Sequence, residues 1–156
     1  MIIRKDKVND ELIVSIRGDI SEKAEDAFGK LLESELDSFL VFDLSKVQMI
    51  NSIGVRVWIL MVSTLKKRQT TIAYRNCSTS IIETLNIFPH FINKKEIESV
   101  FIPTCCVSCD YKDEELSVLK SLRGAVFSPS KLCPSCGIAM TVEIDLDDYL
   151  FFLKDD

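Results

Sequence analysis

Two pairs of cysteines in the last third of the chain carry its clearest chemical signal. Cys106 and Cys109 are separated by two residues, as are Cys133 and Cys136, and 23 residues lie between the pairs. This spacing lets both thiolates of a pair reach one metal ion from a single tight turn, so two turns supply the four tetrahedral sulfur ligands that zinc prefers. Gly137 can adopt the positive φ that such a turn needs after its last ligand. The pattern therefore predicts a structural zinc site.

The other cysteines and the single histidine leave alternatives open. Cys105 directly precedes Cys106 and could replace it as a ligand, although the two-residue spacing favours Cys106. Each pair could instead be a redox-active dithiol, but two matched pairs favour zinc. We expect Cys77 to be a buried or half-buried thiol and His90 to be structural.

The composition is that of a folded soluble protein. The chain has 156 residues, 47% hydrophobic and 28% charged, which suits one domain or a small domain with a metal module. It lacks a run of about 18 apolar residues, so we expect no membrane span. The charged start MIIRKDKVNDELIV does not fit a signal peptide. We therefore expect a cytoplasmic protein, where six cysteines favour metal over disulfides.

Charge is unevenly distributed along the chain. Residues 1–102 carry 14 Lys or Arg and 14 Asp or Glu, whereas residues 103–156 carry 5 and 10, a net charge of −5. Binding to nucleic acid requires basic residues that neutralise phosphates. The cysteine-rich part has the opposite sign, so we expect no nucleic-acid partner.

Hydrophobic periodicity predicts alternating strands and helices before the cysteines. Short apolar runs indicate strands, and apolar residues recurring at three- and four-residue spacing indicate helices. An alternation of this kind is typical of an α/β layer with helices packed on a sheet. The expected elements are strand 11–17, helix 24–36, strand 39–43, helix 53–67, strand 70–74, helix 78–85 and strand 98–103. The acidic and aromatic residues 145–153 are expected to form a strand or helix that closes the core of the cysteine-rich module.

The segment between the second predicted strand and the second predicted helix contains a recognisable motif. Phe42-Asp43-Leu44-Ser45 ends the strand, and Asn51-Ser52-Ile53-Gly54 opens the helix. With the element order, this resembles the STAS domain of anti-sigma factor antagonists, in which D-L-S is followed by D-S-(S/T)-G at a helix start. The resemblance covers residues 1–102.

The resemblance implies a role for Ser52. In the family, the serine at this position is phosphorylated by an anti-sigma factor that is also a serine kinase, and the unphosphorylated domain binds that kinase and releases a sigma factor. A hydroxyl at a helix N-terminus suits this chemistry, because the helix dipole favours a phosphate there. The sequence departs from the family motif at Asn51, which replaces aspartate, and at Ile53. The alternative is that Asn51 and Ser52 only cap the helix.

The predicted helix 53–67 has apolar residues on more than one face. Its main stripe consists of Val55, Trp58, Ile59, Val62 and Leu65. A second set lies opposite, where a helix on the outside of a sheet is normally polar. We expect this set either to be partly buried beneath the cysteine-rich module or, together with Asn51 and Ile53, to contact a partner or a second copy in a homodimer. Its members are Val57, Leu60 and Met61.

Taken together, the sequence predicts an α/β protein with two parts. Residues 1–102 form a STAS-like mixed sheet with packed helices, and residues 103–156 form a small zinc ribbon. With one histidine, no G-x-S-x-G and no P-loop, the chain offers no catalytic set, so we expect no enzyme. The expected function is protein–protein regulation of the anti-sigma factor antagonist kind. The alternatives are an unphosphorylated scaffold subunit of a bacterial signalling or transport assembly, and a redox- or zinc-responsive sensor.

Overall fold

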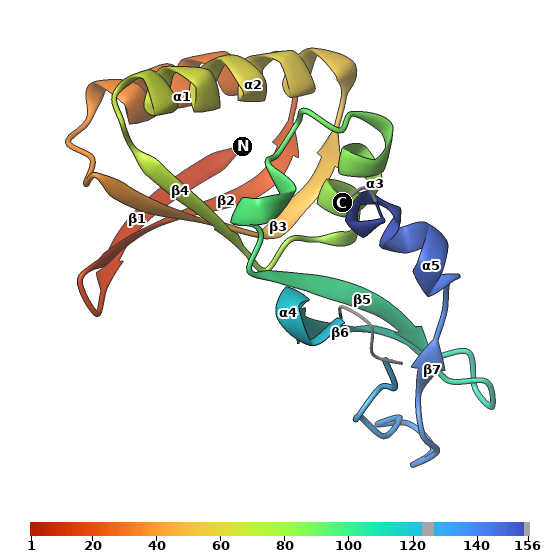
Figure 1. The fold of residues 1–156 in the computed structure, drawn as a ribbon. Coiled ribbons are helices and arrows are strands. Elements are labelled where there is room, and N and C mark those ends of the chain that lie inside the picture. Colours follow the sequence, from red (N-terminus) through yellow and green to blue (C-terminus); the bar gives the residue numbers. More distant parts are fainter. Residues whose placement is uncertain (123–126, 155–156) are drawn as a thin grey trace.

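Two β-sheets form the framework of the protein in the computed structural model, which describes residues 1–122 and 127–154 (Figure 1). The strands are β1 Ile2–Val8, β2 Glu11–Ile20, β3 Phe39–Ile50, β4 Thr71–Arg75, β5 Ser99–Cys105, β6 Lys112–Val118 and β7 Thr141–Val142. The first sheet has the order β1-β2-β3-β4, with β1 antiparallel to β2 and the other neighbours parallel. In the second sheet β5 lies between β6 and β7, antiparallel to both.

Helices cover one face of the first sheet and link it to the second. They are α1 Ala24–Glu33, α2 Ser52–Lys67, α3 Thr79–Ile87, α4 Leu119–Leu122 and α5 Leu146–Tyr149, with short 3-10 turns η1 Lys94–Glu96 and η2 Phe151–Leu153. Helices α1 and α2 lie side by side over the sheet, whereas α5 lies beside α3 near the second sheet (Figure 1). Within the described residues, no helix has the length and apolar character needed to cross a membrane.

The main core lies between α1, α2 and the first sheet, with an aromatic cluster at its centre. Trp58 on α2 is fully buried. Its ring centroid lies 5.3–6.2 Å from those of Phe28, Phe42, Tyr74 and Phe91. At these separations tilted and edge-to-face aromatic pairs contribute beyond their buried area. The cluster therefore fixes α2 against both the sheet and the loop that follows α3.

The structure confirms the predicted fold class and adds three strands that periodicity missed. The mixed sheet with packed helices is present, followed by a small sheet that bears the clustered cysteines. Strand β1 was missed because it is an edge strand whose charged side chains face solvent. A tight turn at Asn9 and Asp10, with φ of 50° and 65°, joins it to β2; positive φ at both positions is typical of a two-residue hairpin loop. Strands β6 and β7, also edge strands, were missed as well, and β7 has only two residues.

The predicted strand 98–103 corresponds to β5, which belongs to the second sheet. Its first residues still contact the first unit: the Cys77 N–H donates to the Ser99 carbonyl at 3.0 Å, and the Phe101 N–H donates to the Cys77 carbonyl at 2.9 Å. β5 pairs with β6 along its whole length and with β7 at its far end, and it ends beside Cys106. One strand thus leads from the first sheet to the cysteines, and the division at residue 102 stays a prediction.

The C-terminal segment was predicted to close the core of the cysteine-rich module, and this was wrong. Helix α5 and η2 pack instead on α3, and their buried residues belong to the main core. The Asn86 side chain donates to the Tyr149 carbonyl at 3.0 Å and accepts from the Phe152 N–H at 3.2 Å. The apolar residues of this segment find their partners on α3, because the cysteine-rich module has only a minimal core of Cys106, Cys133 and Met140.

Candidate regulatory site and cysteine cluster

The first turn of α2 begins at the predicted Ser52 site. Asn51 is the N-cap, with extended backbone, and its Oδ1 accepts a hydrogen bond from the Gly54 N–H at 2.7 Å. This satisfies one of the amide groups that a helix start leaves without an intrahelical partner. Ser52 and Ile53 follow on the outside of the turn and are exposed. The structure thus places the serine hydroxyl at an accessible helix N-terminus.

Gly54 permits an unusually close approach between α2 and β2. A Cβ atom built on Gly54 would lie 2.0 Å from the Ile20 carbonyl oxygen and 2.6 Å from its carbon. The neighbouring Asn51 N–H donates to the same carbonyl at 3.2 Å. Only a residue without a side chain fits here, so the glycine of the motif sets the position of the helix start.

Asn51 also connects the helix start to Glu22, at the turn before α1. Its Nδ2 donates to Glu22 Oε2 at 3.2 Å. The pKa of Glu22 is lowered, first by a hydrogen bond from its own backbone N–H and then by the Asn51 amide. Because the asparagine supplies an acceptor to Gly54 and a donor to Glu22, an aspartate could not make both contacts while ionised. The departure from the family motif therefore has a local structural reason.

The outer face of α2 partly matches the predicted contact surface. Ile53 and Leu60 are 52% and 57% exposed, and Val57 between them is half-buried. Met61 was predicted on this face but is 2% exposed and belongs to the main core, whereas Ile59, predicted in the buried stripe, is 37% exposed. The reason is that α2 packs against both α1 and β2, which turns the buried arc toward Met61. We call Ile53, Val57 and Leu60 the α2 stripe.

The four predicted cysteines come together at the end of the second sheet. The sulfur atoms of Cys106, Cys109, Cys133 and Cys136 all lie within 4.8 Å of one another. The pairs Cys106–Cys136 and Cys109–Cys133 are separated by 3.4 and 3.5 Å, too long for disulfides. Four thiolates around zinc at about 2.3 Å lie about 3.8 Å apart. The geometry of the cluster is thus consistent with a zinc site.

The two cysteine turns have the same backbone geometry. In the first, the Cys106 N–H donates to the Tyr111 carbonyl and the Asp110 N–H donates to the Cys106 carbonyl. In the second, Cys133 bonds with Ile138 and Gly137 in the same way, at 2.8 Å each. The residue after each pair has positive φ, 55° at Asp110 and 74° at Gly137. The predicted role of Gly137 is confirmed, and Asp110 is its equivalent in the first turn.

Backbone amides in these turns point at the sulfur atoms. Desolvation raises the pKa of Cys133, but N–H donors of Ser135 and Cys136, with a contact from Cys109, outweigh it and bring the pKa to about 6. The Tyr111 N–H also lowers the pKa of Cys109, although contacts with the other thiols raise it to about 12. N–H groups directed at sulfur favour the thiolate form, which is the form that ligates a metal.

Cys105, Cys77 and His90 lie outside this cluster. The Cys105 sulfur lies 3.6 Å from the Thr141 hydroxyl, on the opposite side of β5 from Cys106 because strand residues alternate in direction. Cys77 is fully buried in the main core, and burial raises its pKa. His90 is exposed in the loop after α3. The ligand set predicted from the two-residue spacing is thus the set that the fold brings together.

Comparison with known proteins identifies the family of the first unit. The sequence model of the STAS domain matches residues 3–99, so the chain belongs to the STAS domain family. Domains of this family are generally non-catalytic regulatory modules. A search of curated protein sequences found no match.

Several solved structures are similar to parts of the chain, and three of them are the following. SpoIIAA, an anti-sigma factor antagonist in its unphosphorylated form, is 10% identical with a TM-score of 0.48, covering 62% of this chain and 85% of its own. An anti-sigma factor antagonist from Mycobacterium paratuberculosis is 20% identical with a TM-score of 0.42, covering 56% and 77%. A protein described as Mglu is 18% identical with a TM-score of 0.41, covering 47% of this chain but only 19% of its own length. The family assignment rests on the sequence model.

Replacing Gly54 by alanine tests the close approach of α2 to β2. The new Cβ would collide with backbone atoms of Ile20, so we expect Gly54→Ala to lower the free energy of unfolding by about 1–3 kcal/mol or more. Gly29→Ala is the matched control, because a Cβ at this position in α1 meets nothing within 4 Å and alanine is favoured in helices by about 0.5–1 kcal/mol. Urea denaturation measures both, and equal stability of the two variants would contradict the argument.

Replacing Asn51 by aspartate tests the contact with Glu22. We expect Asn51→Asp to be less stable than wild type at pH 7, because two carboxylates then meet, and Glu22→Gln in the same chain to restore stability. Each carboxyl pKa in the folded variant would be raised above its unfolded value. The deficit is therefore present at neutral pH and disappears as the pH falls below about 4. Thermal unfolding at pH 7 and pH 3 measures this, and a deficit that persists at pH 3 would assign it to the helix cap instead.

Proposed function

We propose that this protein is a protein–protein regulatory module of the anti-sigma factor antagonist kind, controlled by phosphorylation of Ser52. Its partner in this proposal is an anti-sigma factor or another serine kinase. The observation that carries the proposal is the exposed Ser52 at the first turn of a helix in a STAS domain, directly before the apolar α2 stripe. A kinase can reach the hydroxyl without unfolding the helix start.

The electrostatics of the helix start support a switch at Ser52. A phosphate adds a charge of about −1.5 to −2, which the N-terminus of α2 favours. The Glu22 carboxylate is hydrogen-bonded to Asn51 on the side toward α1. Its negative charge would repel a phosphate on that side. The phosphate is therefore directed outward, toward any partner that covers the α2 stripe.

The α2 stripe supports a protein partner rather than a substrate. Ile53, Val57 and Leu60 follow one another at four- and three-residue spacing, so they lie on one face of α2. Two of the three are more than half exposed. An apolar face next to a phosphorylation site lets a partner bind by burial of apolar area and lose affinity when charge is added at its edge.

We also propose that the four-cysteine cluster holds structural zinc. Cys106, Cys109, Cys133 and Cys136 fill all four positions of a tetrahedral ion and leave none open for a substrate. The metal would contribute folding free energy to a module whose own core is very small. It would also fix the end of β5, and with it the chain that leads to β7 and α5.

Metal content and thermal stability of single cysteine variants test the zinc proposal. We expect about one zinc ion per chain in wild type and in Cys105→Ser, and a loss of metal in Cys106→Ser, because only the Cys106 sulfur belongs to the cluster. Elemental analysis of the purified proteins measures this, and a chelator is expected to lower the melting temperature of wild type. Wild type without zinc, or Cys105→Ser losing metal while Cys106→Ser keeps it, would refute the assignment.

Affinity capture from the native cell tests the switch. The baits are wild type, Ser52→Glu and, as matched control, Ser63→Glu, which places the same charge at another exposed serine of α2. We expect a kinase-type anti-sigma factor with wild type and Ser63→Glu but not with Ser52→Glu, and phosphate on Ser52 by mass spectrometry of the native protein. Leu60→Glu is expected to lose the partner as well, because it interrupts the α2 stripe.

Two other outcomes would replace this proposal. If all baits return the same partners and Ser52 carries no phosphate, Ser52 is only part of the helix start and the protein is a scaffold subunit. If wild type returns only itself, and Leu60→Glu changes a dimer into a monomer in sedimentation analysis, the α2 stripe is a homodimer interface.

A further inference from the structure

The exposed side of α2 carries cations and no acids. None of the 16 residues of α2 is Asp or Glu, and Arg56 and Lys67 are both exposed. A helix with 3.6 residues per turn places these two side chains within about 60° of Ser52 around its axis. They therefore lie on one side of the α2 stripe, the same side as the serine that the proposed function uses.

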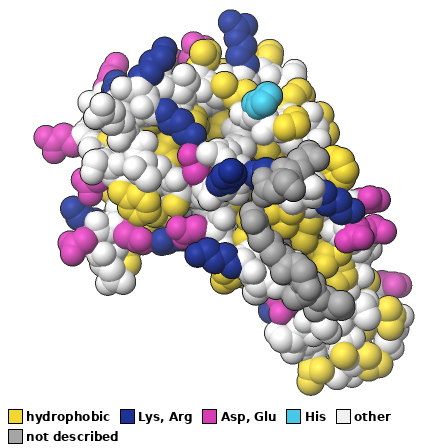
Figure 2. All heavy atoms as spheres, in the orientation of Figure 1, with side chains coloured by type: hydrophobic (Ala, Val, Ile, Leu, Met, Phe, Trp, Pro, Cys, Tyr) yellow, Lys and Arg dark blue, Asp and Glu magenta, His cyan; other side chains and the backbone are white. Residues whose placement is uncertain are grey.

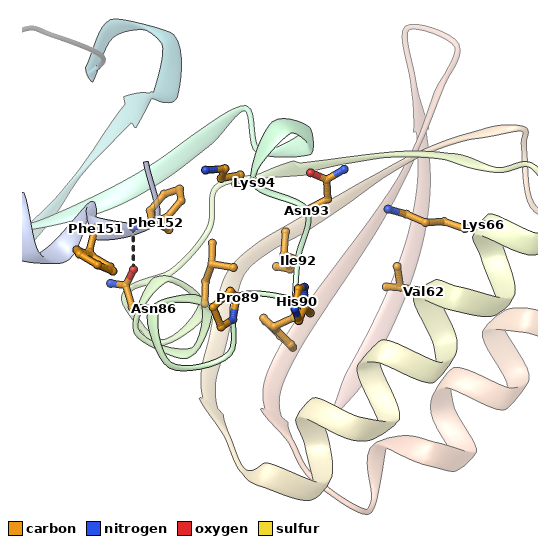
Figure 3. A pocket seen from close by; sticks show the side chains of 12 residues that line it. Val62, Lys66, Asn86, Pro89, His90, Ile92, Asn93, Lys94, Phe151 and Phe152 are labelled. Atoms are coloured by element: carbon orange, nitrogen blue, oxygen red, sulfur yellow. Dashed lines mark hydrogen bonds between the residues drawn. The ribbon is translucent and has the colours of Figure 1, made fainter. Parts of the chain in front are cut away.

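Lys66, by contrast, lies on the side of α2 that faces a pocket. This pocket of about 440 Å³ is formed by the last turns of α2, the end of α3, residues 89–94 and η2, with Phe151 in its lining (Figure 3). Figure 3 shows Val62 and Lys66 on the pocket side of the helix. The Lys66 ammonium pairs with Glu96 at 2.9 Å. Its charge is therefore compensated within the chain, on a different side of α2 from the stripe.

Arg56 and Lys67 are not compensated in this way. Arg68, which follows α2, donates a hydrogen bond to the Leu32 carbonyl at 2.6 Å. In the part of the chain that the structure describes, the side chains of Arg56 and Lys67 form no hydrogen bond or ion pair. Two cations beside the α2 stripe are therefore available to a partner that covers it.

Charge complementarity indicates the chemistry of such a partner. An apolar stripe bordered by two cations matches an apolar surface bordered by carboxylates. On α1, beside α2, Glu25 and Asp26 are exposed, so a partner's carboxylates would be repelled there. Figure 2 shows basic, acidic and hydrophobic side chains close together in the upper part of the molecule, where Figure 1 places these two helices. An acidic amphipathic segment therefore fits over α2 rather than over α1.

Ser52 and Arg56 are neighbours on the surface of α2. Residues at i and i+4 of a helix have Cβ atoms about 5–6 Å apart, and an acidic group N-terminal to a basic one is the favourable order. The guanidinium group binds phosphate through paired hydrogen bonds. On the other side of the serine, Asn51 holds the Glu22 carboxylate. A phosphate on Ser52 therefore has a cation within reach on its outer side and an anion on the side toward α1.

We propose that Arg56 exchanges between two anions: a carboxylate of an acidic, amphipathic partner segment while Ser52 is unmodified, and the phosphate of Ser52 once it is added. The apolar side chains of that segment cover the α2 stripe, and Lys67 binds a second carboxylate. In the modification step the kinase transfers a phosphoryl group from a nucleoside triphosphate to the Ser52 oxygen, which loses its proton, and the diphosphate leaves. The phosphate then takes Arg56 from the partner and repels the partner's carboxylates. This mechanism rests on the proposed phosphorylation of Ser52 and specifies the chemistry of the partner.

Phosphorus NMR of the full-length protein, carrying phosphate on Ser52 through an encoded phosphoserine, tests the pair without any partner. We expect the second pKa of the phosphate to be about 0.2–0.4 higher in Arg56→Gln than in wild type, because a guanidinium at this spacing favours the dianion. Lys67→Gln is the matched control and should leave this pKa unchanged, since Lys67 lies about 22 Å along the axis from Ser52. Equal pKa values in wild type and Arg56→Gln would overturn the exchange at Arg56.

Binding of two synthetic peptides tests the chemistry of the partner. Both are helical peptides of about 18 residues with the same leucine face, bordered by glutamates in one and by lysines in the other. We expect the full-length protein to bind the glutamate peptide at one site, at least about tenfold more tightly than the lysine peptide. Phosphorylation of Ser52 should weaken this binding. Equal binding of both peptides, or no binding of the glutamate peptide, would overturn the acidic partner.

Paired variants place the peptide on α2. We expect Arg56→Gln and Lys67→Gln each to weaken binding of the glutamate peptide about two- to fivefold, the range for exposed ion pairs. The matched control is Lys95→Gln, an exposed lysine in η1, which should bind as wild type does. Unchanged emission of the buried Trp58 shows that each variant is folded. Equal weakening by the control, or a wild-type dimer that Leu60→Glu converts to a monomer, would overturn the assignment.

A failure of the proposed function would give a different result. If the peptide and phosphate results hold but the native protein carries no phosphate on Ser52 and retains no kinase, the phospho-switch is wrong and the acidic-ligand face of α2 stands. If Ser52 is phosphorylated in the cell but Arg56→Gln changes neither the phosphate pKa nor peptide binding, the switch stands and the exchange at Arg56 is wrong.

Discussion

The contact between the first turn of α2 and the end of β2 determines most of what this molecule presents to a partner. The Gly54 backbone lies against the Ile20 carbonyl, so the position of the helix start relative to the sheet has almost no freedom. This placement brings Trp58, one turn later, over Phe42 of the sheet and beside Phe28 of α1. The same placement leaves Ser52 outside the core and exposed to solvent. An exposed serine at this helix start and a close-packed core are consequences of one glycine.

The second constraint is the path of β5 and the chain that returns from it. β5 leaves the first unit through hydrogen bonds with Cys77 and ends where the cysteine cluster begins. From β7 the chain then runs back to α3, where the Asn86 side chain forms hydrogen bonds with the backbone of Tyr149 and Phe152. The small module is thus attached to the STAS domain at both of its ends. The second sheet extends away from the first, and the two parts are joined where β5 begins and where α5 lies beside α3 (Figure 1).

Features set by local chemistry could be predicted from the sequence. The alternating strands and helices follow from periodicity, and the ligand set follows from the spacing of the cysteines, since each turn involves only a few consecutive residues. Assignments that depend on distant contacts were missed. Met61 is buried and Ile59 is exposed, the reverse of the prediction, because α1 covers one side of α2. The C-terminal segment and the pocket beside Phe151 depend on Asn86, more than 60 residues earlier in the chain, and no local pattern reveals that pairing.

Helix α2 connects three surfaces in one rigid element. Ser52 lies at its start, the α2 stripe along its outer face, and Val62 and Lys66 at the pocket near its end. At 1.5 Å per residue, the serine and the lysine are separated by about 21 Å along the axis. The packed aromatic cluster around Trp58 gives the helix a single position, so neither end can signal to the other by moving it. A phosphate on Ser52 would therefore act on a partner directly, at the start of the α2 stripe, rather than by shifting the helix.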